Sequence, residues 1–205
     1  MTTPPPIPVR PAGLSRALVI AGALAALQIS GVVQGLGTRR DFESSSASGG
    51  QFLPPASAQA YREHVARFQA RMLELRNPRR MLALAALSLP VALATIAAAV
   101  QLNRRKRRAA LWFSYTLAAL LVVLVIDLVL AVQTFRVLQS FANELPRALV
   151  PQGVAVEVAE SPGAVLVSLV TGPFVFVLAW HVALIVGCLH ALHQVRRPEV
   201  GAWAS

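Results

Sequence analysis

The sequence predicts an all-α integral membrane protein, a bundle of four transmembrane helices with an amphipathic helical cap from the first extramembrane loop. Of its 205 residues, 56% are hydrophobic and only 14% are charged, whereas about a quarter of the residues in a soluble domain are charged. Four long stretches contain almost no charge, and about 20 apolar residues suffice for a helix to cross a bilayer. No alternating pattern of about ten residues repeats, which excludes a transmembrane barrel.

The four apolar stretches set the expected organisation of the chain. We expect a proline-rich tail over 1–15, spans over 16–38, 81–103, 110–135 and 164–193, connections over 39–80, 104–109 and 136–163, and a second tail over 194–205. The first apolar stretch is longer than the roughly 7–15 residues of a signal-peptide core, and no small-residue cleavage site follows it closely. We therefore expect it to be a retained membrane anchor.

Basic residues give the expected orientation. They divide almost evenly between the two sides of the membrane, but the run Arg104-Arg105-Lys106-Arg107-Arg108 lies in a very short connection, where the positive-inside rule is strongest. We therefore expect both termini in the cytoplasm and both long loops in the periplasm. Lys106 is the only lysine in this arginine- and alanine-rich chain, which is typical of a GC-rich bacterial genome. The expected location is a bacterial inner membrane.

The net charge of +10 comes mainly from arginines that flank the spans, without interleaved aromatic residues. Such residues fix topology and contact anionic lipid headgroups. The lipid bilayer is thus an expected partner, and nucleic acid is not.

The first loop carries the pattern of an amphipathic helix over 57–76. Ser57 can cap it after Pro54-Pro55. One helical face collects the apolar residues of this segment: Tyr61, Val65, Phe68, Met72 and Leu75. This face can pack on the bundle, lie on the membrane surface or bind a partner. Asn77-Pro78 permits an almost continuous passage into the second span, because proline is tolerated in a first helical turn.

The second loop begins as a helical continuation of the third span, with apolar residues at helical spacing up to Pro146. Beyond it, residues 154–158 alternate as in a strand, between turn signals at 151–153 and 161–163. Helices from both loops can therefore project together as a cap.

Asp127 is the only charged residue of the third span, where a carboxylate costs about 2.5–3.5 kcal/mol on insertion scales. Helix rise places polar residues of the other spans at a similar depth: Ser30, Gln34, Ser88, Ser168 and Thr171. The layer is either a proton or cation relay or a hydrogen-bonded clamp between helices. A relay predicts that Asp127→Asn keeps the fold but abolishes proton-linked activity in proteoliposomes, and unchanged activity would contradict it.

Small residues form a stripe on the first span: Gly22, Ala26, Gly31 and Gly35. Such residues let helix backbones approach closely, either within the bundle or between copies of the chain.

The sequence contains no catalytic motif and predicts no cofactor or metal site. Cys188 is the only cysteine, and no zinc-binding spacing occurs. His181 is expected to be a neutral hydrogen-bonded histidine, and His190 and His193 are expected to lie at the membrane interface. The first three spans have no histidine, which argues against a b-type haem.

These patterns favour a non-catalytic membrane protein, an accessory, assembly or scaffold subunit of an envelope complex. Its expected partner is another membrane protein or a second copy of the chain. The alternative is a small proton- or cation-coupled transporter or channel-like protein that uses Asp127. A third hypothesis is an intramembrane enzyme, but no paired catalytic residues support it.

Overall fold

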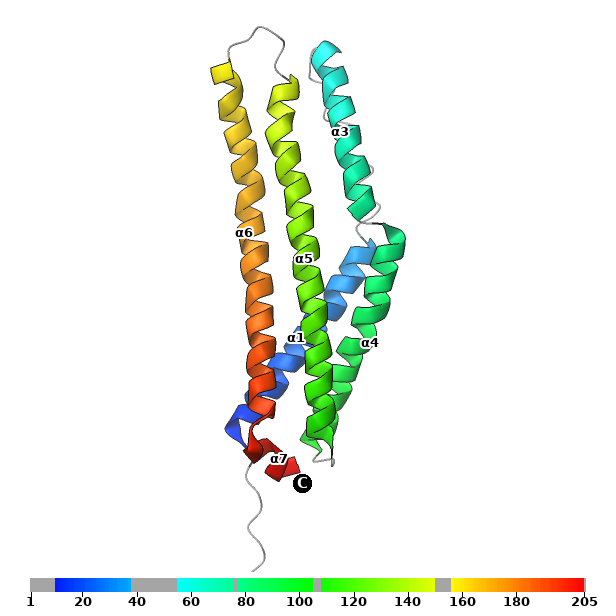
Figure 1. Cartoon of the computed structure of the whole chain (residues 1–205), viewed down its shortest axis with the longest axis vertical. Coiled ribbons are helices and arrows are strands. Elements are labelled where there is room, and N and C mark those ends of the chain that lie inside the picture. The colour runs from blue at the N-terminus through cyan, green and yellow to red at the C-terminus, as the bar shows by residue number, and fades with distance from the viewer. Residues whose placement is uncertain (1–9, 38–54, 76, 105–107, 150–155, 205) are drawn as a thin grey trace, which may run out of the picture. The chain divides into compact units, whose positions relative to one another are not determined.

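A computed structural model describes residues 10–37, 55–75, 77–104, 108–149 and 156–204, which are almost entirely helical (Figure 1). The helices are α1 (Ala12–Gly37), α3 (Pro55–Leu75), α4 (Pro78–Asn103), α5 (Ala109–Leu149), α6 (Val156–Val195) and α7 (Pro198–Ala204). No strand occurs within these ranges. The predicted all-helical class is confirmed for the part of the chain that the structure describes.

Four helical stretches are long and apolar enough to cross a membrane. They lie at Ala12–Gly31, within Gln59–Asn103, at Ala109–Glu144 and at Thr171–Val195. Because lipid offers no hydrogen bonds to the backbone, helices that satisfy their own N–H and C=O groups suit this environment. The number of spans read from the sequence agrees with this finding.

The chain forms two compact units. Unit 1 contains Met1–Val33, Leu84–Val125 and Val182–Ser205, and unit 2 contains Gln34–Ala83 and Ile126–His181. The main hydrophobic cluster belongs to unit 1, where Leu14, Phe113, Leu117 and Cys188 are fully buried. Residues from α1, α4, α5, α6 and α7 contribute to this cluster.

Within unit 1, α1 and α6 lie against each other in antiparallel register. A Cβ added at Gly187 would meet Ile20 Cγ2 at 3.5 Å, and one added at Gly13 would collide with the Gln194 side chain. The Cys188 thiol donates to the Leu117 carbonyl over 3.4 Å and so joins α6 to α5. Small residues at these positions let the backbones approach.

Thr95 joins α4 to α5 in the same unit. Its buried hydroxyl donates to the Val91 carbonyl over 2.8 Å and reaches the Thr116 carbonyl of α5 at 3.5 Å. Because the contact between helices is long and hydrogen bonds in membranes average about 0.6 kcal/mol, Thr95→Val is expected to destabilise the protein by less than about 1 kcal/mol. SDS titration in mixed micelles, followed by circular dichroism, measures this.

Thr134→Val is the matched control, because the Thr134 hydroxyl donates to the Leu130 carbonyl of its own helix. A loss that is larger for Thr134→Val than for Thr95→Val would contradict a linking role for Thr95.

Helix α7 lies within residues 194–205, where the sequence analysis expects only a tail. Its sequence does carry start signals, Pro198 in the first position and Glu199 in the first turn. Val200 and Trp203 are buried in the cluster of unit 1. The helix therefore covers the end of that core, next to the last turn of α6 (Figure 1).

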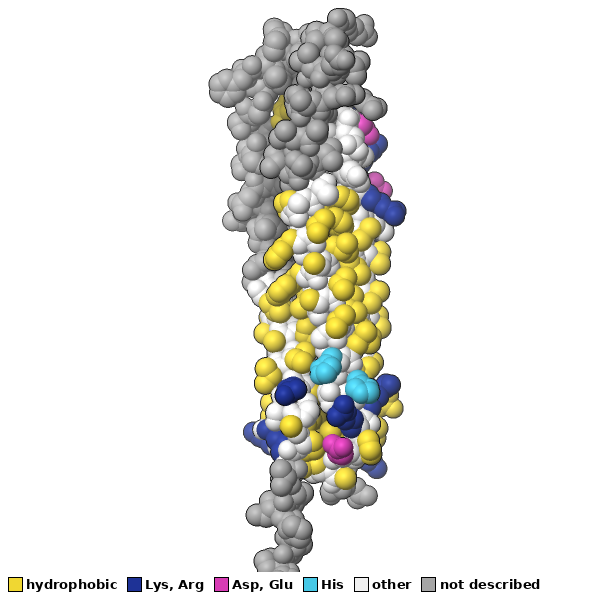
Figure 2. All heavy atoms as spheres, turned by 90° about the vertical axis from the view of Figure 1, so that its left-hand side faces the viewer, with side chains coloured by type: hydrophobic (Ala, Val, Ile, Leu, Met, Phe, Trp, Pro, Cys, Tyr) yellow, Lys and Arg dark blue, Asp and Glu magenta, His cyan; other side chains and the backbone are white. Residues whose placement is uncertain are grey.

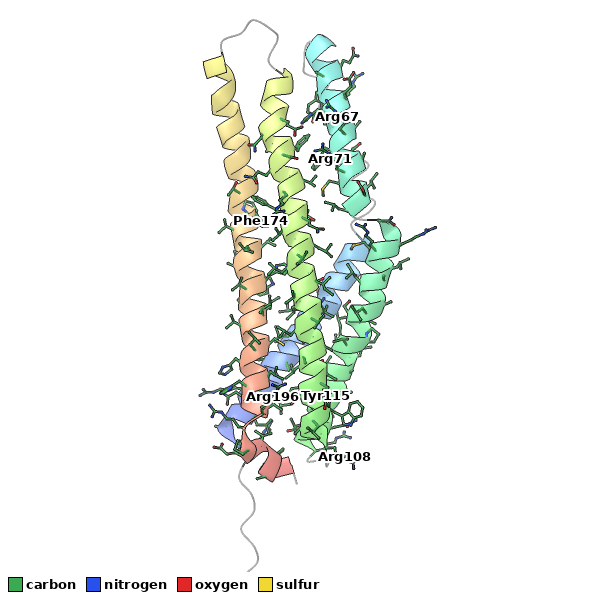
Figure 3. All side chains as sticks on the ribbon, viewed as in Figure 1. Arg67, Arg71, Arg108, Tyr115, Phe174 and Arg196 are labelled. Atoms are coloured by element: carbon green, nitrogen blue, oxygen red, sulfur yellow. The ribbon has the colours of Figure 1, made fainter. Side chains whose placement is uncertain are left out.

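Exposed basic residues gather at this end of unit 1, where α1 and α5 begin and α4 and α6 end. They are Arg10, Arg16, Arg104, Arg108, Arg196 and Arg197, and Figure 3 labels two of them beside Tyr115. Trp112 and Tyr115 on α5 are 62% and 69% exposed. Arginines beside outward-facing aromatic side chains are typical of a membrane–water interface. On the face drawn in Figure 2, charged and histidine side chains lie at this end, and hydrophobic ones cover the adjoining surface.

Several helix ends differ between the sequence-based predictions and the structure. Residues 156–158, expected in a strand, belong to α6, and residues 154 and 155 lie outside the described part. The expected break at 161–163 is also helical, and α5 runs through Pro146. Adding a residue to an existing helix is far easier than starting one, so a long apolar helix extends past its hydropathy boundary. The helix expected from Ser57 begins at Pro55, so Ser57 lies in its first turn.

Asn77 caps the start of α4. Its Oδ1 accepts a hydrogen bond from the Arg79 amide over 3.0 Å, as an N-cap residue does. Pro78 occupies the first helical position, where its missing N–H has no helical acceptor to lose.

Candidate functional site

The candidate site lies in unit 2 between α3 and α5. One face of α3 is buried. On it, His64 and Met72 are each 5% exposed, and four further side chains are half-buried: Tyr61, Val65, Phe68 and Leu75. Arg62, Glu63 and Glu74 are exposed. The apolar face read from the sequence is therefore the buried face, and at least part of it packs on the protein's own helices.

Phe141 of α5 is the centre of this contact. Its ring lies 4.3 Å from the Phe68 ring in a tilted arrangement and 5.1 Å from the His64 imidazole, which stacks on it at 20°. Aromatic pairs at such separations contribute about 0.5–1.5 kcal/mol beyond the area they bury. Phe141 thus contacts two successive turns of α3.

A small pocket opens beside these rings. It is lined by His64, Arg67, Phe68 and Arg71 of α3, and by Val137, Phe141 and Glu144 of α5. It encloses about 20 Å³ for solvent, roughly the space of one ordered water molecule. Figure 3 shows Arg67 and Arg71 on the side of α3 that faces α5.

His64 is the unusual residue of the pocket. Its Nε2 is buried without a hydrogen-bond partner among the described residues. A buried polar atom in this state costs about 1–3 kcal/mol, so most proteins pair such atoms. The residue lines a pocket together with Arg67 and Arg71, whose side chains are exposed.

The polar groups around His64 are connected through α3 itself. Arg67 Nε donates to the Glu63 carbonyl over 3.4 Å, and the Gln59 amide donates to Glu63 Oε1 over 3.2 Å. The Arg67 guanidinium has further N–H donors besides Nε. The arrangement can therefore offer several N–H groups to one acidic group.

Sequence reasoning missed His64. Its position on the face of Tyr61, Phe68 and Met72 was the available signal, because those residues are three, four and eight positions away and share a helical face. The contact itself could not be read from the sequence, because Phe141, which stacks on His64, comes from a distant part of the chain.

The predicted polar layer divides between the two units. Ser30 and Ser88 belong to unit 1, and Asp127 and Thr171 belong to unit 2. Ser88 is buried, Asp127 and Thr171 are half-buried, and Ser30 is exposed. The side chains of Gln34 and Ser168 lie outside the described residues. A layer that unites these groups around Asp127 therefore stays a prediction.

The predicted small-residue stripe does not face the core of unit 1. A Cβ at Gly22 or Gly31 would meet no heavy atom within 4 Å, and Ala26 is exposed. The Gly35 side-chain position lies outside the described residues. The buried face of α1 instead carries Leu14, Ala17, Ala21, Leu24 and Ala25, because shape complementarity with the neighbouring helices selects the packed face.

The remaining histidines show ordinary helix contacts. His181 Nδ1 donates to the Val177 carbonyl over 2.8 Å, which fixes the proton on that nitrogen. His190 and His193 are exposed near the end of α6, and His190 Nε2 lies 3.4 Å from Gln194 Nε2. Within the described ranges, no group of three or more His, Cys, Asp or Glu residues could hold a metal ion.

Comparisons with known proteins give no relative, since no protein-family model, no curated protein and no solved structure matches the chain. Its function is therefore inferred from its residues and their geometry.

Proposed function

We propose that this protein is an accessory or scaffold subunit of an envelope complex in a bacterial inner membrane. The four apolar stretches form a transmembrane bundle, and α3 with the outer part of α5 forms a helical cap in the periplasm. The cap binds a partner protein, and the role is binding rather than catalysis.

The observation that carries this proposal is the pocket between α3 and α5. It combines a buried His64 Nε2 without a partner with the Arg67, Arg71 and Glu144 side chains. Unsatisfied buried polar atoms are rare in native proteins, and a bound water, an ion or a functional role accounts for most of them. The exposed Arg67 and Arg71 side chains beside this space can donate hydrogen bonds to a partner.

The orientation part of the proposal is supported by the six exposed arginines at one end of unit 1. The positive-inside rule assigns short arginine-rich connections to the cytoplasm, and Arg104 and Arg108 flank such a connection. In a Cys188→Ala background, we expect Arg62→Cys to react with a membrane-impermeant maleimide added to the periplasmic side. Asn103→Cys is expected to react only after the inner membrane is opened. The reverse pattern would contradict the orientation.

Site-specific photocrosslinking in cells tests the binding role. A photoreactive amino acid at the exposed position Glu74, next to the pocket-lining side of α3, is expected to give one adduct of defined mass at native expression level. Arg62 is the matched control, because it is exposed on the side of the same helix opposite the pocket-lining residues by helical periodicity.

Equal adducts from both positions, or none from position 74, would contradict a partner site on the cap. An adduct that contains only a second copy of the chain would replace the proposed complex with a homo-oligomer.

A further inference from the structure

We infer that the end of α6, together with the first turns of α1, binds the headgroup of one anionic phospholipid. The acyl chains of this lipid lie along the exposed apolar face of α6. The inference goes beyond the proposed function, because this surface belongs to unit 1 and the proposed partner site belongs to unit 2. The two share only the location of the chain in a membrane.

One exposed face of α6 changes from apolar to basic along the helix. Val186 and Leu189 on this face are 58% and 48% exposed. Helical periodicity places the exposed side chains of His190, His193 and Arg197 on the same face, one to three turns further along. On the side drawn in Figure 2, histidine and basic side chains follow the hydrophobic surface in this order. A phospholipid has the matching order of groups, since its acyl chains lead into a phosphate.

Arg16 adds a basic side chain from α1. Gly13 of α1 lies against the Gln194 side chain, and a Cβ at Gly187 of α6 would lie 3.5 Å from Ile20. Positions 13, 16 and 20 share one face of a helix, so Arg16 lies on the side of α1 that contacts α6. Because its side chain is exposed, it lies at the edge of this contact, where a headgroup on α6 can meet it.

The charges of unit 1 favour an anionic headgroup. Arg16, Arg196 and Arg197 are exposed, and Glu199 is the only acidic residue among the described residues of this unit. Guanidinium groups bind phosphate oxygens through paired N–H donors, and imidazole rings supply further N–H donors. Basic surfaces between helices at the cytoplasmic side bind anionic headgroups. A zwitterionic headgroup also carries an ammonium group, which the arginines repel.

Arg104 and Arg108 offer a comparison within the same unit. Both are exposed at the same end as the proposed site, but they flank the connection between α4 and α5. A general attraction of this end to an anionic membrane surface would involve these two arginines equally. A site on α1 and α6 would not depend on them.

Native mass spectrometry of the purified full chain in detergent micelles counts bound lipids and gives the Kd of the first one. The probes are dioleoyl phosphatidylglycerol, which is anionic, and dioleoyl phosphatidylcholine, which is zwitterionic and has the same acyl chains. We expect phosphatidylglycerol to bind about tenfold tighter or more. Glycerophosphoglycerol, the same headgroup without acyl chains, is expected not to displace it, because it lacks the apolar contacts with α6.

The variants Arg16→Gln and Arg197→Gln are each expected to weaken binding of phosphatidylglycerol about fivefold, the usual effect of one basic residue at an anionic membrane surface. Arg104→Gln is the matched control and is expected to leave the affinity unchanged. Circular dichroism confirms that each variant is folded.

Three results would overturn the inference: equal affinity for the two lipids, an equal loss of affinity in Arg104→Gln, or displacement of the lipid by glycerophosphoglycerol at a similar concentration. A mass of two chains without bound lipid would also overturn it, since a second copy of the chain would then cover this face of α6.

The photocrosslink at position 74 separates this inference from the proposed function. Selective lipid binding without any crosslink in cells contradicts the partner role and leaves the lipid site standing. A crosslink without selective lipid binding contradicts the lipid site and leaves the partner role standing.

Discussion

Replacing Phe113 with alanine is expected to destabilise the protein by about 3 kcal/mol or more, the usual range for removing a buried phenylalanine ring. Phe113 is fully buried in the cluster of unit 1 and is among its largest fully buried side chains. In a membrane the loss comes mainly from packing, because an apolar side chain gains little by leaving lipid for protein. A cavity left by the ring forfeits the dispersion contacts of all the atoms around it.

Leu111→Ala is the matched control for this prediction. Leu111 lies two residues away on the same helix but is 60% exposed, so its truncation is expected to cost less than about 1 kcal/mol. SDS titration in mixed micelles, followed by circular dichroism, gives both free energies of unfolding. Equal losses for Phe113→Ala and Leu111→Ala would show that the cluster of unit 1 does not hold these helices together.

Replacing His64 with phenylalanine is expected to raise the free energy of unfolding by about 1–2 kcal/mol. The change removes the buried Nε2, whose missing hydrogen bond costs about 1–3 kcal/mol. Phenylalanine retains the stacking on Phe141.

His181→Phe is the control for the His64 variant. His181 Nδ1 already donates to the Val177 carbonyl, so no unsatisfied atom is removed and no gain is expected. Thermal unfolding of the free protein, followed by circular dichroism, compares the two variants. Destabilisation by His64→Phe would mean that Nε2 makes a stabilising bond in the free protein, and it would remove the main support for the pocket as a binding site.

The four long apolar helices were predictable from the sequence for a physical reason. A helix in lipid must satisfy its own backbone hydrogen bonds, so a long uncharged stretch leaves few alternatives to a helix. The face of α3 was predictable as well, because helical periodicity places Tyr61, Val65, Phe68, Met72 and Leu75 on one side. Both results depend on local composition and spacing, which are read directly from the chain.

Helix ends and packed faces were less predictable. Residues 156–158, expected in a strand, lie in α6, which begins at Val156, because an apolar helix extends readily past its hydropathy boundary. Within unit 1, Ala21 and Ala25 are buried small residues of α1, whereas a Cβ at Gly22 or Gly31 would meet no heavy atom within 4 Å, so a role of that stripe between copies of the chain stays a prediction. Adjacent faces of one helix can have similar residue compositions. The sequence alone then does not show which face packs, and the neighbouring helices decide it.

The amino-acid sequence alone therefore established the helical class, the four apolar stretches and the amphipathic face of α3, since each follows from interactions within a short segment. The tertiary structure was needed for the pocket. His64 stacks on Phe141 of α5, and Arg67 and Arg71 of α3 line the same pocket as Glu144 of α5. Whether a polar atom is satisfied depends on groups from distant parts of the chain, and no local pattern contains that information.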